Sequence, residues 1–290
     1  MDETRLAYAF FLRGWVYHGQ NNFDRAIADY DQAISLNAQF WDAIYHRGLA
    51  YFNEQNATRA IVDLDEAIRL NPEFAPAFSV RGRAYYSLRQ CAQAVPDFDR
   101  ALSLYPQIAN AHFYRGRCYE RQGDLIRARS DYDEAIRLQP DYVEAYMRRG
   151  DTYAIAPPHD FARAIADYDS AIRLQPDNPD WLNSRCWARA LLGQLEPPLA
   201  DCDASIAIRS QPKTLQSRGF VHLRRREFEA AFADYDAAVR GDSSITMALY
   251  GRGIAQLRLG HASDGQADIA AATARDPGLP AFFAESNIRP

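Results

Sequence analysis

The dipeptide Arg-Gly recurs along the chain at a nearly constant interval, and no other feature limits the possible folds as strongly. Successive copies lie 34, 34, 34, 34, 36, 33 and 34 residues apart, with Arg185-Cys186 in place of one copy. A period of this length indicates similar supersecondary units that stack on one another, because one unit cannot bury its own apolar face. The arginines of the seven intact copies are Arg13, Arg47, Arg81, Arg115, Arg149, Arg218 and Arg252.

A second marker, Asp-Tyr-Asp or a close variant, keeps the same interval, and its last copy is reduced to Asp268 followed by Ile269 and Ala270. In a typical unit the first aspartate follows the arginine by 16 residues, as Asp131 follows Arg115. We expect such pairs to be structural and interior, because a residue repeated once per unit serves the unit. The second aspartate lies about 200° round its helix from the first, so it needs another partner. We expect the arginine four residues on, as in Asp65–Arg69, Asp133–Arg137, Asp169–Arg173 and Asp236–Arg240.

Within each unit the apolar residues are spaced as on two helices joined by a tight turn. In the fourth unit the turn is Gln122-Gly123-Asp124, where Gly123 suits the end of one helix and Asp124 the N-cap of the next. Proline stops the second helix of several units before the next unit begins. These residues are Pro72, Pro106, Pro140 and Pro176.

The pattern resembles the tetratricopeptide repeat (TPR), a 34-residue helix–turn–helix unit with Gly, Tyr, Ala and Pro at set positions. The resemblance covers roughly residues 7–279. It implies an all-α, right-handed superhelical solenoid whose first helices line a concave groove, and protein binding without catalysis or a cofactor. The expected units are 7–40, 41–74, 75–108, 109–142, 143–178, 179–211, 212–245 and 246–279, followed by a C-terminal cap at 280–290.

Composition argues against several classes of partner. The net charge of −5 provides no general attraction to nucleic acid or to an anionic membrane. No stretch approaches the ~18 apolar residues of a membrane span, and the first residues do not resemble a signal peptide. We therefore expect a cytoplasmic protein, and we interpret the single lysine, Lys213, as the mark of a GC-rich bacterial genome. The four cysteines are far apart, so we expect reduced, packed thiols at Cys91, Cys118, Cys186 and Cys202.

No group of residues indicates catalysis or metal binding. The six histidines lack the spacing of metal ligands, and the chain contains neither Gly-x-Gly-x-x-Gly nor a P-loop pattern. Paired acids such as Asp29 and Asp31 occur on a repeated helix and not in a unique cleft. The sequence therefore predicts a protein that is not an enzyme and that needs no metal.

Residues that vary between repeats on the groove side of the first helices are the candidates for ligand contact. The first two units present aromatic residues there, which would anchor apolar ligand groups, and the next three alternate arginines with aromatics, which would capture carboxylates. The alternative is that the aromatics fill the interior of the superhelix while Glu120, Glu144 and Asp151 neutralise the arginines. The candidates are Phe11, Trp15, Tyr45, Phe52, Arg83, Tyr86, Phe113, Tyr114, Arg117, Arg121 and Arg148.

The sequence thus predicts a scaffold for a peptide or partner helix that carries acidic and aromatic or apolar residues. Two alternatives stay open: self-assembly into a head-to-tail homo-oligomer, or a regulatory part of a larger enzyme or transport system. For Phe282 and Phe283 we expect a short helical cap that lays both over the last repeat. The other possibility is an exposed pair that receives Phe10 and Phe11 of another molecule.

Overall fold

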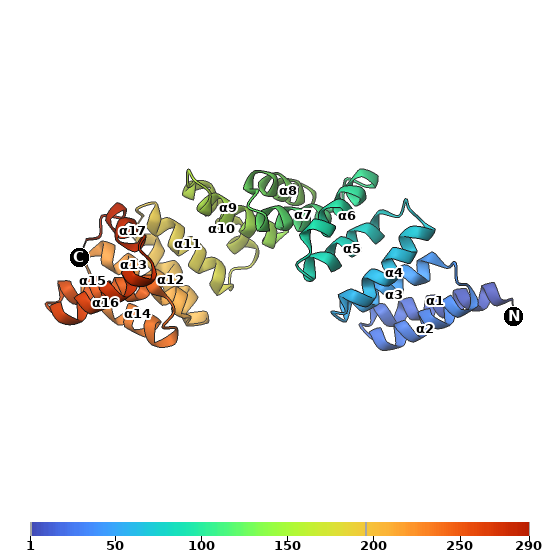
Figure 1. Cartoon of the computed structure of the whole chain (residues 1–290), viewed down its shortest axis with the longest axis horizontal. Helices are drawn as coiled ribbons and strands as arrows, with labels where there is room; N and C mark the ends of the chain where they lie inside the picture. The colour runs from blue at the N-terminus through green and yellow to red at the C-terminus, as the bar shows by residue number, and fades with distance from the viewer. Residues whose placement is uncertain (1, 195, 290) are drawn as a thin grey trace. The chain divides into compact units, whose positions relative to one another are not determined.

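The chain folds into tandem pairs of helices, as Figure 1 shows. The structure, a computed structural model, describes residues 2–194 and 196–289, and the side chains of all of these except 196–198. Within these residues every regular element is a helix, so the predicted all-α fold of tandem repeats is confirmed. Eight pairs are followed by one short helix in this described part of the chain.

The helices form two compact units, Met1–Ala145 and Tyr146–Pro290, and the division falls inside α9. The expectation of one continuous solenoid stays a prediction. The first unit contains α1 (Glu3–Gly19), α2 (Phe23–Leu36), α3 (Trp41–Asn53), α4 (Ala57–Leu70), α5 (Ala75–Ser87), α6 (Cys91–Leu104), α7 (Ala109–Arg121) and α8 (Leu125–Leu138). The following helices are α9 (Val143–Ile155), α10 (Phe161–Leu174), α11 (Pro179–Leu191), α12 (Glu196–Ile208), α13 (Pro212–Arg225), α14 (Phe228–Gly241), α15 (Thr246–Arg258), α16 (Ala262–Arg275) and α17 (Leu279–Glu285).

The turn inside the fourth pair follows the predicted chemistry. Gly123 has a φ of +80°, the left-handed conformation that favours glycine, and the Asp124 side chain accepts a hydrogen bond from the Arg127 amide at 3.0 Å. In the first repeats a non-glycine residue takes the same conformation, as at Asn21 with a φ of 57°. A following asparagine, Asn22, then caps the next helix.

In most repeats a glycine of the first helix lets an aromatic ring of the second helix approach closely, whereas Gly48 meets Leu64 and Gly253 meets Ile269. A Cβ atom on Gly116 would lie 2.9 Å from Cε1 of Tyr132, and one on Gly82 would lie 2.7 Å from Cε1 of Phe98. Tyr132 and Phe98 are fully buried. The Gly of each Arg-Gly is therefore required by packing, since a Cβ atom there would press on side-chain or backbone atoms of the second helix.

The sixth repeat replaces this glycine–aromatic contact with a disulfide between Cys186 and Cys202, so the expectation of four reduced thiols is wrong for these two. Cys186 stands where other repeats have Gly and Cys202 where they have the aromatic residue, so their side chains must face one another. Cys91 and Cys118 are free and buried, as predicted. Disulfides persist mainly in oxidising compartments, so the cysteines no longer support the expectation of a cytoplasmic protein.

Each arginine of the Arg-Gly series forms a bidentate pair with the first aspartate of its own repeat, as predicted. In the fourth repeat Nε and Nη2 of Arg115 donate to the two carboxylate oxygens of Asp131 at 2.9 and 2.7 Å. The Asp131 side chain is only 5% exposed, and that of Arg115 is 21% exposed. Burial by itself would lower the pKa of the Arg115 guanidinium. The hydrogen bonds to Asp131 and Asp99 outweigh this effect, so the pKa lies above the ordinary value of arginine.

The same arginines also bind the preceding repeat, which corrects the expectation for the second aspartates. Nη1 of Arg115 donates to Asp99 of the third repeat at 2.7 Å. Of the four predicted pairs within one helix only Asp236–Arg240 forms as an ion pair, at 2.7 Å, whereas Arg69 pairs with Glu66. The second helix of one repeat packs against the first helix of the next, so the second aspartate is within reach of that arginine. The inter-repeat pairs are Arg47–Asp31, Arg81–Asp65, Arg115–Asp99, Arg185–Asp169, Arg218–Asp203 and Arg252–Asp236.

We expect Arg115→Ala to lower the free energy of unfolding by about 2–4 kcal/mol. It removes both guanidinium hydrogen bonds from the buried Asp131 carboxylate, which then keeps only the His112 ring, at 3.2 Å, as a side-chain partner, and it breaks a link between repeats. Arg127→Ala is the matched control, since it removes an exposed pair with Asp124 and should cost no more than ~1 kcal/mol. Chemical denaturation followed by circular dichroism measures both. Equal, small losses would show that these arginines are solvated and not structural.

Two double variants test the packing argument for the cysteine pair. Cys186→Gly with Cys202→Tyr rebuilds the contact of the other repeats, whereas Cys186→Ala with Cys202→Tyr adds one methyl group where no space is expected. We expect the glycine variant to be the more stable by about 1–2 kcal/mol, because overpacking outweighs the cost of glycine in a helix. The two are compared by denaturation under reducing conditions, and a more stable alanine variant would contradict the argument.

Candidate functional site

A row of large apolar side chains lies exposed along α1. Tyr8, Leu12, Trp15 and Val16 are 54%, 44%, 56% and 49% exposed. Their spacing of four, three and one residues places them on one face of the helix. An exposed apolar face of this kind usually marks a binding surface.

Two cavities flank this face in the first unit. One of about 410 Å³ lies between the start of α1 and the segment before α3, and includes Tyr8 and Phe40. The other, of about 380 Å³, is lined by residues of α1 and α3 and of the turn that follows α1. Its lining residues are Trp15, Val16, His18, Gly19, Gln20, His46 and Leu49.

His46 forms part of the wall of the second cavity and is largely withdrawn from water. Its ring lies 5.4 Å from that of Phe11 and 6.0 Å from that of Tyr30. Burial lowers its pKa to about 4, and the neighbouring His18 contributes to the same shift. Asp42, at 3.9 Å from Nε2, is too distant to keep the ring protonated. His46 is therefore a neutral wall residue at pH 7.

Three of the predicted ligand contacts are buried between neighbouring repeats. Phe11 packs against Phe40, Tyr45 against Phe74 and Phe113 against Tyr142, with ring centroids 5.1, 4.9 and 4.7 Å apart. The aromatic partner in each case comes from the segment just before the next first helix. For Phe11, Tyr45 and Phe113 the arrangement agrees with the alternative that aromatics fill the interior.

Arg83 on α5 lies close to two aromatic rings, one from the preceding first helix and one from the following first helix. Its Cζ is 4.7 Å from the ring centre of Phe52 on α3 and 5.4 Å from that of Tyr114 on α7. Burial raises the pKa of Tyr45 to about 12, and Arg83 lies close enough to oppose that rise. Among the described residues no carboxylate pairs with Arg83, and its buried Nε has no hydrogen-bond partner. The rings hold the guanidinium in place without neutralising it.

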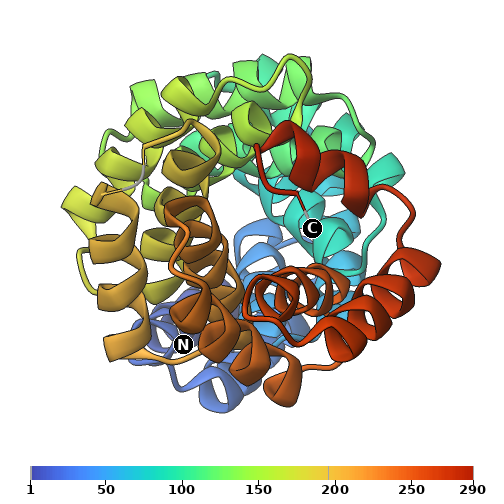
Figure 2. The same cartoon turned by 90° about the vertical axis from the view of Figure 1, so that its left-hand side faces the viewer.

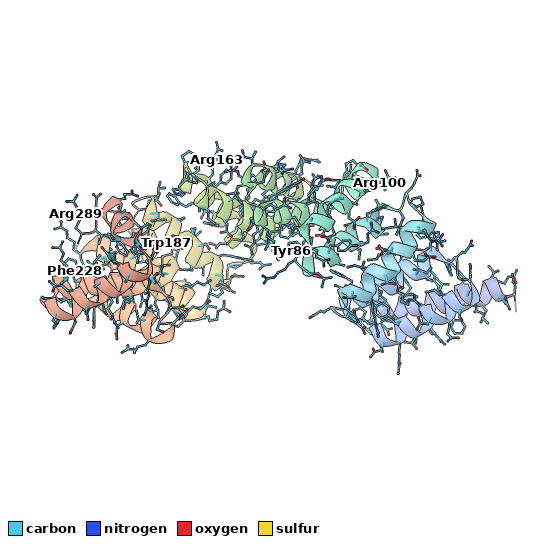
Figure 3. All side chains as sticks on the ribbon, viewed as in Figure 1. Tyr86, Arg100, Arg163, Trp187, Phe228 and Arg289 are labelled. Carbon is cyan, nitrogen blue, oxygen red and sulfur yellow. A yellow bond between two sulfur atoms is a disulfide. The ribbon has the colours of Figure 1, made fainter. Side chains whose placement is uncertain are left out.

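Two further arginines lie over Tyr86, which Figure 3 labels on α5. Cζ of Arg121 is 4.0 Å and Cζ of Arg117 is 5.7 Å from the ring centre of Tyr86. Arg121 also donates to the backbone oxygen of Tyr86 at 3.2 Å. The predicted alternation of arginines and aromatics is therefore present as a set of stacked contacts across α3, α5 and α7.

The acids neutralise some of these arginines and not others. Nε of Arg117 lies 3.5 Å from Glu120, which also accepts a hydrogen bond from the Tyr132 hydroxyl. In the second unit, Arg148 lies 3.7 Å from Asp151. The alternative interpretation, in which acids neutralise the arginines, therefore fits Arg117 and Arg148. Among the described residues neither Arg83 nor Arg121 has a carboxylate within ion-pair distance, and Arg83 is the less exposed of the two.

The corresponding side of the second unit is covered by the chain itself. The helix α17, dark red in Figure 2, follows α16 as a separate short helix. Phe283 is fully buried against Phe220 and Tyr250, and Phe282 packs against Phe220 and against Trp187, which Figure 3 labels. Neither phenylalanine is among the large exposed apolar side chains of the described residues. The cap itself stays a prediction, which this packing supports.

Sequence reasoning did not select Tyr142, which packs on Phe113 and donates a hydrogen bond from its hydroxyl to Asn110 at 2.9 Å. The sequence does contain a pattern that identifies Tyr142, because large apolar residues precede the first helices of successive repeats at the same 34-residue interval. These residues are Phe40, Phe74, Ile108 and Tyr142.

Within the described residues no group of His, Cys, Asp or Glu side chains is arranged to hold a metal ion. In the same part of the chain no helix has both the length and the apolar character needed to cross a membrane.

Family models described as tetratricopeptide repeats match most of the first 179 residues. One matches residues 7–40, another 42–74, and a third both 80–142 and 127–179. None of the curated protein sequences compared with the chain matches it.

Among solved structures, the chain is similar to YrrB, described as a TPR protein with an unusual peptide-binding site. The two are 27% identical with a TM-score of 0.52, over 61% of this chain and 90% of YrrB. It is also similar to PilF of Pseudomonas aeruginosa, with 14% identity and a TM-score of 0.64 over 72% of this chain and 94% of that one. A tetratricopeptide repeat protein of Parabacteroides merdae is 14% identical, with a TM-score of 0.59 over 87% and 99% of the two chains. The last two show the fold alone.

Acid should destabilise the first unit through His46. Its pKa is about 4 in the folded chain and about 6.5 when unfolded, so its contribution to stability is complete above pH 6.5 and is lost as the pH falls toward 4. The loss approaches about 3 kcal/mol. Melting temperatures between pH 7 and pH 4 measure it. His46→Gln should flatten the profile, whereas His261→Gln, at an exposed position, should not; identical profiles would contradict the assignment.

Proposed function

Because the chain belongs to the tetratricopeptide repeat family, we propose that it is a protein-interaction scaffold whose first unit binds a peptide or partner helix. The binding face consists of the exposed side of α1 and the arginine–aromatic contacts of α3, α5 and α7. The similarity to YrrB, described by its peptide-binding site, supports this proposal. The function requires no catalytic residue, metal or cofactor.

Arg83 carries the proposal. Its guanidinium is partly buried between Phe52 and Tyr114, so its side chain is ordered before a ligand arrives. No described carboxylate satisfies it, so a ligand carboxylate would gain charge-assisted hydrogen bonds without displacing an existing ion pair. An ordered, unneutralised arginine is the arrangement expected of an anion-recognising position.

The apolar part of the face supplies the second element of recognition. Trp15 is exposed beside a cavity of about 380 Å³, whereas the aromatics deeper in the unit are already packed. Aromatic residues at such positions contribute strongly to protein–protein binding. The ligand therefore combines an apolar or aromatic group with an acidic one.

Self-assembly through the ends has less support. The proposed sticky pair, Phe282 and Phe283, is occupied within its own unit by Trp187, Phe220 and Tyr250. Head-to-tail association would first have to release these contacts.

A peptide array probed with the full chain tests the proposal. We expect Arg83→Gln to weaken the binding of recovered acidic peptides at least tenfold, because a charge-assisted hydrogen bond contributes about 1.5–3 kcal/mol. The matched control is Arg59→Gln on α4, since Arg59 also lies over a tyrosine ring, that of Tyr51, but on a second helix. Circular dichroism confirms that each variant is folded. Equal binding by Arg83→Gln and Arg59→Gln would contradict the proposal.

A further inference from the structure

The residue that follows each Arg-Gly occupies an equivalent place in every repeat, and it varies. We call this residue the post-glycine position, and count the residue after Arg185-Cys186 with it. Only the first and sixth repeats carry tryptophan there. In chain order the residues are Trp15, Leu49, Arg83, Arg117, Asp151, Trp187, Phe220 and Ile254.

In the second unit the post-glycine positions hold an aromatic pair from α17. The ring of Phe282 lies 6.1 Å from Trp187 and 5.8 Å from Phe220, between the post-glycine residues of the sixth and seventh repeats. Phe283 then lies 5.9 Å from Phe220 and 4.9 Å from Tyr250 of the eighth repeat. The segment therefore crosses three consecutive first helices.

The segment that contains α17 is closed by local structure. Asn287 adopts a left-handed φ of 59°, and the Ile288 amide donates to the Phe283 oxygen at 2.9 Å. This C-terminal turn brings Ile288 back onto the repeats, where it is buried. Ile288 lines the same small cavity as Ile254, the post-glycine residue of the eighth repeat.

The first three repeats present the same positions with no segment over them in the described structure. Trp15 corresponds to Trp187 and Leu49 to Phe220, and both line the cavity of about 380 Å³. Arg83 corresponds to Ile254. The first unit thus contains residues equivalent to those that Phe282 contacts in the second unit, and Arg83 replaces the apolar Ile254.

We propose that the first unit binds a short helical segment of a partner protein, with adjacent aromatic residues followed five or six residues later by a carboxylate. The aromatic pair packs on Trp15 and Leu49, as Phe282 packs on Trp187 and Phe220. The carboxylate meets Arg83, where the chain's own segment has Ile288 against Ile254. The inference rests on the proposed function and specifies its ligand.

The charge of Arg83 distinguishes this partner from a second copy of the chain. The chain's own segment offers the uncharged Ile288 at the last contact and would leave the guanidinium without a carboxylate there. A segment with an acid at that place satisfies it. Arg83 therefore selects against the chain's own C-terminal segment and in favour of an acidic partner.

Three fluorescent, C-terminally amidated 11-residue peptides test the inference with the full chain. The first has the sequence of residues 279–289, the second adds Ile288→Glu, and the third adds Phe282→Ala and Phe283→Ala to the second. In fluorescence anisotropy at 0.15 M salt we expect the second to bind at least tenfold more tightly than the first and the third not to bind measurably.

Variants of the chain locate the binding. Trp15→Ala should lose the second peptide, and Arg83→Gln should reduce its affinity to that of the first. Ile126→Ala, which removes an exposed apolar side chain from α8, should leave the affinity within twofold. Trp15 and Ile126 are both exposed, so neither variant is expected to impair folding.

The inference is overturned if the second peptide does not bind, if it binds no better than the first, or if Trp15→Ala leaves its affinity unchanged. It is also overturned if Trp187→Ala, and not Trp15→Ala, alters binding, since the peptide would then replace α17 on the second unit. In any of these cases, array peptides that still require Arg83 would show that the proposed function holds with a different ligand.

Discussion

The structure depends on one interaction, the arginine that binds two aspartates from successive repeats. Arg115 shows the arrangement: two of its nitrogens engage the buried Asp131 and the third engages Asp99. The planar guanidinium suits this role, because its donors point in fixed directions and it stays charged when partly buried. A single residue type thereby fixes both the two helices of a repeat and the distance to the repeat before it. The ends of the described repeats reflect this logic: Arg13 has only Asp29, and Ala270 replaces the second aspartate of the last copy.

This repeated geometry leaves the residue at the post-glycine position free to vary. The Arg-Gly pair faces the second helix, where Gly116 admits the Tyr132 ring, so the following side chain points elsewhere and is not needed for the pair to form. Tryptophan, leucine, arginine, aspartate, phenylalanine and isoleucine all occur there. Stability and recognition are thus assigned to neighbouring residues of one helix. This division lets a repeat protein change its ligand while its fold stays intact.

The two units use the same positions in different ways. In the second unit, Trp187 and Phe220 are occupied by α17 from the same chain. In the first unit, Trp15 is exposed and Arg83 keeps a charge that no described carboxylate neutralises. An apolar third contact suits a permanent intramolecular cover. A charged one suits a ligand that binds and leaves, since electrostatic recognition improves specificity and association rate more than it adds permanent stability.

The sequence by itself determined the helix pairs, their turns and the pairing of each arginine with its own first aspartate, because these depend on spacing within one repeat. Tertiary structure decided the partners between repeats. The second aspartates meet the next arginine, and not one four residues on, because stacking brings them closer to the neighbouring helix. Cys186 and Cys202 had the spacing of a facing pair, but only the packed helices showed that they bond. Stacking also decided which candidates are available: it buried Phe11, Tyr45 and Phe113, paired Arg117 with Glu120, and left Trp15 and Arg83 open. The exposure of a side chain and the neutralisation of an arginine depend on neighbours that are distant in sequence. The repeat period could therefore identify these candidates, but it could not show which of them are available to a ligand.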